Sequence, residues 1–249
     1  MPWGILPPMK GFLVLLVSIL SFSGASGQDA RELAAAKEQF AVADRELNAV
    51  YQTAKARLPG YRFEEIQEEQ RDWITYRDDR SLAGAQFDGG AREGSEKENP
   101  SYWETAAALT ESRTEILRGW LKADQFGTDW EGVWSDGFGG RLYLRETGPG
   151  GVEFYLSVVR GPTYHLGEIG GLAITNGQLA RFAIEAILGE PDGETWLTFH
   201  RENGRLRIIG VNTQYFHGAR AYFDGEYVRV RELSQQDHQE MRRGIDAME

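Results

Sequence analysis

The sequence predicts an α+β protein in which an N-terminal antiparallel three-helix bundle precedes a small antiparallel eight-stranded β-barrel, with a sandwich as the alternative. Apolar residues recur at helical spacing up to about residue 122, and from Trp130 onward they alternate as in half-buried strands. Asn176-Gly177 and Asn203-Gly204 predict two-residue hairpin turns, because both central residues of a type I′ turn need positive φ angles.

The second half of the chain contains eight short alternating segments separated by turn residues. Closing them into a barrel would remove the exposed edges that an open sheet leaves. The expected strands span 132–135, 141–146, 152–160, 168–175, 179–186, 195–201, 205–211 and 226–231.

The first 27 residues are typical of a secretory signal peptide. Lys10 precedes the apolar run 12–20, which is too short for a permanent membrane-spanning helix, and Ala25-Ser26-Gly27 has the small residues of a cleavage site. We therefore expect a periplasmic or secreted protein that is free of the membrane after cleavage, with an uncleaved anchor as the alternative. The expected organisation is a signal peptide (1–27), a helical domain (28–124), a β-barrel domain (129–232) and a C-terminal helical tail (233–249).

Three helices are expected in the helical domain. The first is capped by Asp29 and ends at Pro59-Gly60, and the second spans about 63–82. The third spans about 101–122, where Ser101 and Glu104 have the spacing of a capping box. The intervening stretch 84–101 is rich in glycine and predicts a mobile loop without packed structure.

Polar side chains lie on the apolar faces of these predicted helices. Arg77 and Gln70 share a face with Trp73, while Arg113 and Asp44 lie in the apolar stripes of the other two helices. An unpaired buried charge costs several kcal/mol, so we expect the aspartate and both arginines to form one buried cluster. The predicted structural network comprises Asp44, Asn48, Gln70, Trp73, Arg77 and Arg113.

Three motifs in this region occur in a fixed order. They are Asp44-x-x-Leu47-Asn48-x-x-Tyr51, Gln70-x-x-Trp73-Ile74-x-Tyr76-Arg77-Asp78 and Leu109-Thr110-x-x-Arg113-x-x-x-Leu117. Residues 35–121 thereby resemble the LprI-type lysozyme-inhibitor N-terminal domain. The resemblance implies an envelope protein that inhibits a lysozyme. Members often carry a cysteine pair, which the resemblance places at Ser81 and Thr105 and implies to be adjacent in space.

The composition narrows the chemistry that is expected. The chain has no cysteine, which excludes a disulfide, a thiolate nucleophile and a zinc–thiolate site. Its formal net charge of −11 is shared by both domains, which disfavours nucleic acid or an anionic membrane as a partner and favours a basic protein. None of its four histidines has helical metal-site spacing, and no nucleophile elbow or phosphate loop occurs. We therefore expect no metal, no cofactor and no enzymatic activity.

Two groups of residues are candidates for partner binding. The first is a glycine-rich hairpin loosely similar to the inserting loop of MliC-like inhibitors of C-type lysozyme, and an ordinary hairpin turn is its alternative. The second could form a barrel mouth for a small ligand or peptide, or simply face the barrel interior. The first comprises Ser135, Gly137, Phe138, Arg141 and Tyr143, and the second includes His165, Tyr215 and His217 together with Gln214, Phe216, Arg220, Tyr222, Asp224 and Tyr227.

These observations predict an exported, non-enzymatic protein that acts by protein–protein binding, with lysozyme inhibition implied by the resemblance. The rival interpretation is a β-barrel that binds a small molecule or a cell-wall fragment, and a hydrolase is the third alternative. A deep pocket inside the barrel would favour the rival, whereas a filled barrel with a protruding loop would favour inhibition.

Overall fold

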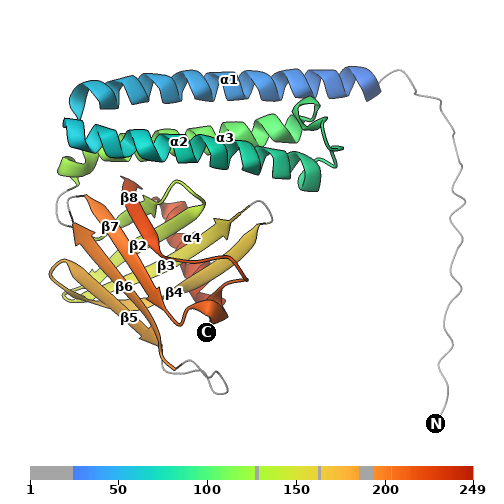
Figure 1. The fold of residues 1–249 in the computed structure, drawn as a ribbon. Helices are drawn as coiled ribbons and strands as arrows, with labels where there is room; N and C mark the ends of the chain where they lie inside the picture. The colour runs from blue at the N-terminus through green and yellow to red at the C-terminus, as the bar shows by residue number, and fades with distance from the viewer. Residues whose placement is uncertain (1–24, 127–128, 162–163, 185–192, 203, 249) are drawn as a thin grey trace, which may run out of the picture.

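The computed structural model places a helical module over one end of a closed β-barrel (Figure 1). The described residues are 25–126, 129–161, 164–184, 193–202 and 204–248. The architecture is α+β as the sequence predicts, and the second part is a barrel rather than a sandwich. The expected signal peptide lies outside the described residues except for its last three, with which the first helix begins.

The helical module consists of α1 (Ala25–Arg57), α2 (Gly60–Ala83) and α3 (Pro100–Lys122). Proline at position 59 separates α1 from α2, and α1 lies mainly along α3 (Figure 1). Each helix turns only part of its surface inward, so burial of the apolar stripes requires all three to pack together. The predicted three-helix bundle is confirmed.

Two predicted helix starts are wrong. Because α1 begins at Ala25, Asp29 lies within the helix instead of capping it. The N-cap of α3 is Asn99, whose side-chain oxygen accepts a hydrogen bond from the Ser101 backbone N–H at 2.9 Å. Pro100 at the first helical position has no N–H to satisfy, which suits a start one residue earlier than predicted.

The segment between α2 and α3 is structured, contrary to the predicted loop without packed structure. It contains a π-helical turn, η1 (Gly84–Asp88), and a 3₁₀ turn, η2 (Glu96–Glu98). The buried Glu96 carboxylate accepts hydrogen bonds from the Gln86 side chain at 2.7 Å and the Gly94 backbone N–H at 2.9 Å. One carboxylate thus organises a glycine-rich segment that composition alone marks as a loop.

Eight strands form the barrel. Each strand pairs antiparallel with the next, and β1 pairs with β8 to close the ring, which leaves no edge strand. All eight expected strands are present, although Glu185 and Ala186, the expected end of the fifth, lie outside the described residues. The strands are β1 (Gly132–Ser135), β2 (Gly140–Gly148), β3 (Gly151–Arg160), β4 (His165–Asn176), β5 (Leu179–Ile184), β6 (Thr195–Glu202), β7 (Arg205–Val211) and β8 (Gly225–Arg231).

The turn between β4 and β5 departs by one residue from the prediction. Asn176 pairs with Leu179, so the central turn residues are Gly177 and Gln178 rather than Asn176 and Gly177. Gly177 has a φ angle of +64°, the left-handed conformation that glycine adopts without steric cost. The glycine therefore determines where the turn forms.

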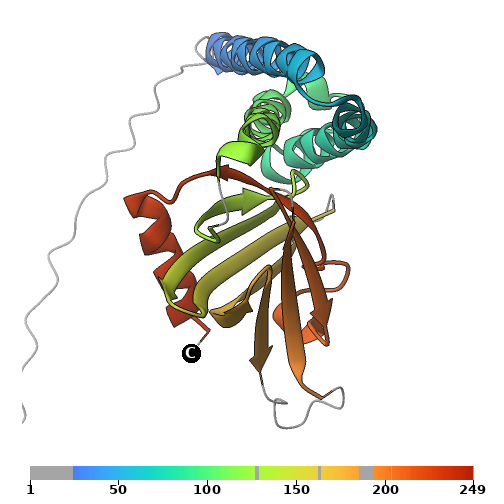
Figure 2. The same cartoon turned by 90° about the vertical axis from the view of Figure 1, so that its left-hand side faces the viewer.

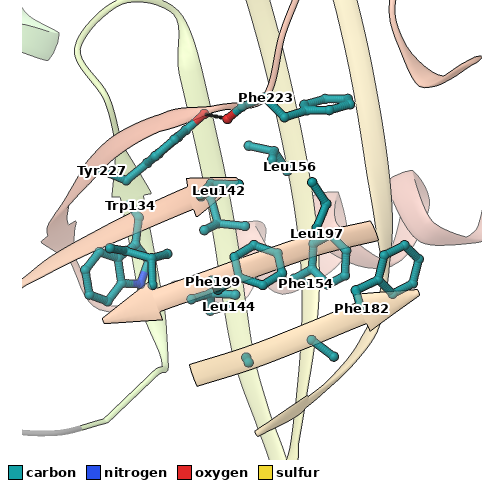
Figure 3. Packing of buried hydrophobic residues seen from close by; sticks show 14 of the residues in the cluster. Trp134, Leu142, Leu144, Phe154, Leu156, Phe182, Leu197, Phe199, Phe223 and Tyr227 are labelled. Atoms are coloured by element: carbon teal, nitrogen blue, oxygen red, sulfur yellow. Dashed lines mark hydrogen bonds between the residues drawn. The ribbon is translucent and has the colours of Figure 1, made fainter. Parts of the chain in front are cut away.

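Apolar side chains fill the barrel interior (Figure 3). The ring of Phe154 contacts those of Phe182 and Phe199, with centroids 4.9 and 5.0 Å apart. Near the helical module, the fully buried Tyr227 donates its hydroxyl hydrogen to the Phe223 carbonyl at 3.2 Å. The described side chains thus make the interior a packed core, stabilised by burial of apolar surface.

A second apolar cluster joins the helical module to the barrel. It combines Ile116 and Trp120 of α3 with Val228 and Val230 of β8. A Cβ atom on Gly119 would lie 2.4 Å from a β8 carbonyl oxygen, so this glycine allows the backbones of α3 and β8 to approach closely. The two parts are therefore held together by direct packing as well as by the chain.

The tail forms α4 (Gln235–Asp246), which packs against β3 and β4 on the outside of the barrel (Figure 2). Ser234 and Asp237 form a capping box at its start, where the sequence predicts a helix N-terminus. Gly244 lies against the Tyr155 ring, which brings α4 close to the sheet. Among the described helices, none has the length and apolarity needed to cross a membrane.

Candidate functional site

The β1–β2 hairpin, predicted to bind a partner, is closed by hydrogen bonds to one side chain. Asp136 Oδ1 accepts from the backbone N–H groups of Phe138 at 2.8 Å and Gly140 at 2.7 Å. Gly137 and Gly139 supply φ angles of +77° and +92°, which favour glycine. The glycines therefore permit a compact turn rather than a long flexible loop.

This hairpin faces the helical module. The Phe138 ring meets the Tyr76 ring of α2 edge to face, with centroids 5.4 Å apart. A Cβ atom on Gly137 would lie 3.4 Å from the Arg113 guanidinium of α3. The tip of the hairpin is therefore covered by helices, because a turn of small residues lets them approach the end of the barrel.

The remaining hairpin candidates are also engaged within the fold. The Arg141 guanidinium lies 3.7 Å from the Glu115 carboxylate of α3. Tyr143 is buried against Tyr155 with their rings stacked, and burial raises the pKa of Tyr143 to about 12. The hairpin thus takes the form of the ordinary turn that was its alternative, packed against α2 and α3. A binding role for Ser135, Gly137, Phe138, Arg141 and Tyr143 stays a prediction.

A buried ion pair lies beneath the hairpin. Arg160 Nη1 is 2.5 Å from Asp136 Oδ2, and the two side chains are only 4% and 7% exposed. Arg160 also donates hydrogen bonds to the carbonyls of Phe138 at 2.9 Å and Tyr222 at 3.2 Å. Because each guanidinium nitrogen has a partner, with Nη2 bonded to the Tyr227 hydroxyl at 3.4 Å, the buried charge is compensated.

This pair was missed by sequence reasoning, although a signal existed. Arg160 follows Leu156 and Val158 at alternate positions of β3, so the alternation places it on the inward face. Because arginine is charged and lies at the end of the strand, the inward alternation was not extended to position 160. Asp136 lies in the predicted hairpin turn, where aspartate is common, so its residue type gives no sign of a buried ion pair.

In the helical module, Arg113 is fully buried and held by α2. Its Nη1 lies 3.1 Å from Glu69 Oε2, and its Nε donates to Gln70 Oε1 at 2.9 Å. The guanidinium carbon is 5.9 Å from the centroid of the Trp73 ring. Burial lowers the pKa of Arg113, while the Glu69 carboxylate opposes that effect.

The second arginine, Arg77, contacts the same Trp73 ring but pairs with a different carboxylate. It pairs with Asp78 at 2.9 Å and lies over the Trp73 ring at 5.3 Å. Asp44 is half-buried on α1 and accepts a hydrogen bond from Asn48 at 3.0 Å. The predicted single cluster of Asp44 with both arginines is therefore wrong, because α2 provides carboxylates of its own beside each of them.

The barrel-mouth candidates have different surroundings. His217 Nε2 is 3.1 Å from Thr213 Oγ1, and the imidazole packs on the Phe223 ring at 5.3 Å. Tyr215, in the 3₁₀ turn η4 (residues 214–216), is 61% exposed. His165 is half-buried at the start of β4. A ligand-binding role for these residues stays a prediction, since they combine a packed histidine with an exposed ring.

A hollow of about 590 Å³ lies at the free end of the helical module, where the start of α1 meets the η1–η2 segment and the start of α3. Its lining is strongly acidic and contains no lysine or arginine among the described residues. This surface therefore suits a cationic partner. The acidic lining residues are Asp29, Glu32, Glu98 and Glu104.

The filled barrel and its helical cover define an α+β protein with its charged hollows on the outside of the fold. The family model described as lysozyme inhibitor LprI matches residues 23–117, which cover α1, α2 and most of α3. The helical module therefore matches the LprI family model, in the region where the sequence motifs indicated the resemblance. Comparison of the chain with curated proteins and with solved structures gives no match.

Proposed function

We propose that the protein is an exported lysozyme inhibitor that acts by protein–protein binding. The observation that carries this proposal is the LprI match over the helical module. LprI is a family of inhibitors, which agrees with the expectation of a protein without enzymatic activity. A basic extracellular enzyme such as a C-type lysozyme would complement the net charge of −11.

The helical module, rather than the β1–β2 hairpin, supplies the contact surface in this proposal. The hairpin packs against α2 and α3, whereas the acidic hollow between the start of α1, the η1–η2 segment and the start of α3 is open. Its carboxylates would attract lysine and arginine side chains of the enzyme. Charge complementarity of this kind speeds association and weakens with added salt.

The rival function is binding of a small molecule or cell-wall fragment by the barrel. Its main requirement is an interior cavity, because small-molecule sites are usually enclosed and largely preformed. Leu142, Phe154 and Phe199 are among the fully buried side chains that occupy this interior (Figure 3). The filled core supports protein binding over the rival.

The proposal also includes export of the protein and its division into domains. Residues 1–27 would direct export and be removed, leaving the helical domain (28–124), the barrel domain (129–232) and the tail (233–249) in the periplasm or outside the cell. LprI proteins are typically exported, which supports this location. The partner would then be met outside the cytoplasm.

Lysis of a bacterial cell-wall suspension by a C-type lysozyme tests the proposal. The purified protein should slow the loss of turbidity, and Glu98→Lys with Glu104→Lys should weaken inhibition by about tenfold or more at low salt. Glu194→Lys with Asp246→Lys is the matched control, because it changes the net charge equally at exposed positions outside the hollow. The control should inhibit like the parent protein.

The possible results distinguish an error in the proposed function from an error in the proposed contact surface. Full lysozyme activity in the presence of a folded parent protein would refute inhibition of that enzyme class. Equal weakening by both double variants would mean that total charge, not the hollow, governs binding.

A further inference from the structure

The outer wall of the barrel over β4 to β7 carries an exposed apolar patch. Its aliphatic members are 44–62% exposed, and the half-buried Trp196 lies among them. Contiguous apolar surface of this kind on a soluble protein usually marks an interaction site. The patch, called the apolar wall here, consists of Leu172, Ile174, Leu179, Trp196, Ile209 and Val211.

The strand register places these residues side by side. One row across the sheet runs from Ile174 through Arg181 and Thr198 to Ile209, each residue paired with the next. The adjacent row runs from Ala183 through Trp196 to Val211. The patch therefore spans neighbouring strands, with Arg181 and Thr198 lying between Ile174 and Ile209.

Within the described residues, the rest of the fold leaves most of this wall exposed. The helical module packs on β8 and reaches β7 at Arg205, which pairs with Glu65 of α2 and lies over the Trp120 ring, and α4 packs on β3 and β4 (Figures 1 and 2). The wall residues of β5, β6 and β7 stay exposed or half-buried beyond these contacts. Inward residues of the same strands, such as Leu197 and Ile208, are already buried in the core. The exposed side chains are thus additional to what the barrel needs for its own stability.

Two exposed side chains of opposite charge, Arg181 and Asp224, lie on opposite sides of the centre of the patch. Arg181 is exposed on β5 and lies over the Trp196 ring at 5.3 Å. The exposed Asp224 lies beside Ile209, because its Oδ1 accepts from the Gly210 backbone N–H at 3.0 Å. The two charges thus flank β6 and β7, separated by about three strand spacings or ~14 Å.

We propose that the apolar wall is the interface of a symmetric dimer with a second copy of this chain. A two-fold axis between Thr198 and Ile209 would place Arg181 of each copy opposite Asp224 of the other, with the aliphatic rows packed between them. A two-fold interface must complement itself, and this arrangement of charges does so. The inference is independent of lysozyme inhibition and concerns a different surface.

Sedimentation equilibrium of the purified protein over a range of concentrations tests the dimer. The parent protein should show reversible dimerisation, and Ile174→Glu with Ile209→Glu should weaken it at least tenfold. Val42→Glu is the control, because Val42 is 50% exposed on α1 and lies outside the wall. It should dimerise like the parent protein.

A charge exchange tests the symmetry itself. Arg181→Glu alone should weaken the dimer by placing two carboxylates together, and adding Asp224→Lys should restore it. A parent protein that stays monomeric at every concentration would overturn the proposal. A monomer that uses the apolar wall to bind lysozyme would overturn it too. A dimer indifferent to the wall variants, or a charge exchange without recovery, would overturn it as well.

Discussion

Arg160 and Asp136 form the most deeply buried ion pair that the structure describes, with 2.5 Å between Nη1 and Oδ2. The arginine ends β3, and the aspartate closes the β1–β2 turn beneath α2 and α3. The pair therefore fixes the end of the barrel on which the helical module rests. Its neighbour Tyr227 is also buried, and burial raises the pKa of that hydroxyl well above its usual value.

Asp136→Ala should lower the free energy of unfolding by about 3–5 kcal/mol, because it leaves the Arg160 charge buried without a counter-charge. Urea unfolding followed by tryptophan fluorescence measures the loss. The control is Glu38→Ala, which removes an exposed partner of Arg45 and should cost less than about 0.5 kcal/mol. Equal small losses would show that the Asp136 pair contributes no more than a surface ion pair.

Gln70→Ala should cost about 1–3 kcal/mol, because the buried Nε of Arg113 would lose its acceptor. Asp44→Ala should cost less than about 1 kcal/mol, since Asp44 is half-buried and bonded to Asn48 on its own helix. Chemical unfolding of both variants compares them. The reverse order would restore the single charge cluster that the sequence predicted.

Ser81→Cys with Thr105→Cys should form a disulfide under oxidising conditions. A Cβ on Gly84 would lie 2.5 Å from Thr105 Oγ1, and the Gly84 N–H bonds to the Ser81 carbonyl, so the end of α2 adjoins the start of α3. The bridge should raise the free energy of unfolding by about 3 kcal/mol through loop closure. Thiol titration measures bridge formation, and the two single variants are the controls. Free thiols that persist in the folded double variant would contradict the predicted adjacency of positions 81 and 105.

Asp237 should make α4 sensitive to acid. Hydrogen bonds from Arg231 and Ser234 hold the pKa of the buried Asp237 carboxyl well below its usual range. A depressed folded-state pKa gives stabilisation that is present above about pH 4 and lost as the pH falls further. Asp237→Asn should therefore be about 2 kcal/mol less stable than the parent near pH 7 and approach it near pH 2.

Thermal unfolding between pH 2 and 7 measures this difference. Asp246→Asn is the matched control at an exposed position of the same helix and should follow the parent throughout. A stability gap for Asp237→Asn that stays constant with pH would exclude the ionised carboxylate as its cause.

The strands were predictable because their signals are local. Apolar residues at every second position, such as Val152, Phe154 and Leu156, indicate which face of the strand points into the core. Turn residues mark where each strand ends. Helical spacing likewise places Trp73 and Arg113 on the inward faces of their helices, and both are buried in the structure. Barrel closure then follows from the need to pair every edge.

The partners of charged residues were not predictable in the same way. Helical periodicity places Arg113 inside, but it does not distinguish Glu69 of α2 from Asp44 of α1 as the nearest carboxylate. The packing of the β1–β2 hairpin against the helices was not predictable for a related reason, because it depends on where α2 lies relative to the barrel. Periodicity along one segment contains no information about that placement.

The charge-dependent association of the protein with a C-type lysozyme is the most direct test of the inhibitor proposal. Association rates should be measured by surface plasmon resonance at low and high salt for the parent, for Glu98→Lys with Glu104→Lys, and for the Glu194→Lys with Asp246→Lys control. We expect salt-sensitive binding that the first double variant loses and the control retains. Absence of binding by the folded parent at low salt would contradict the proposal.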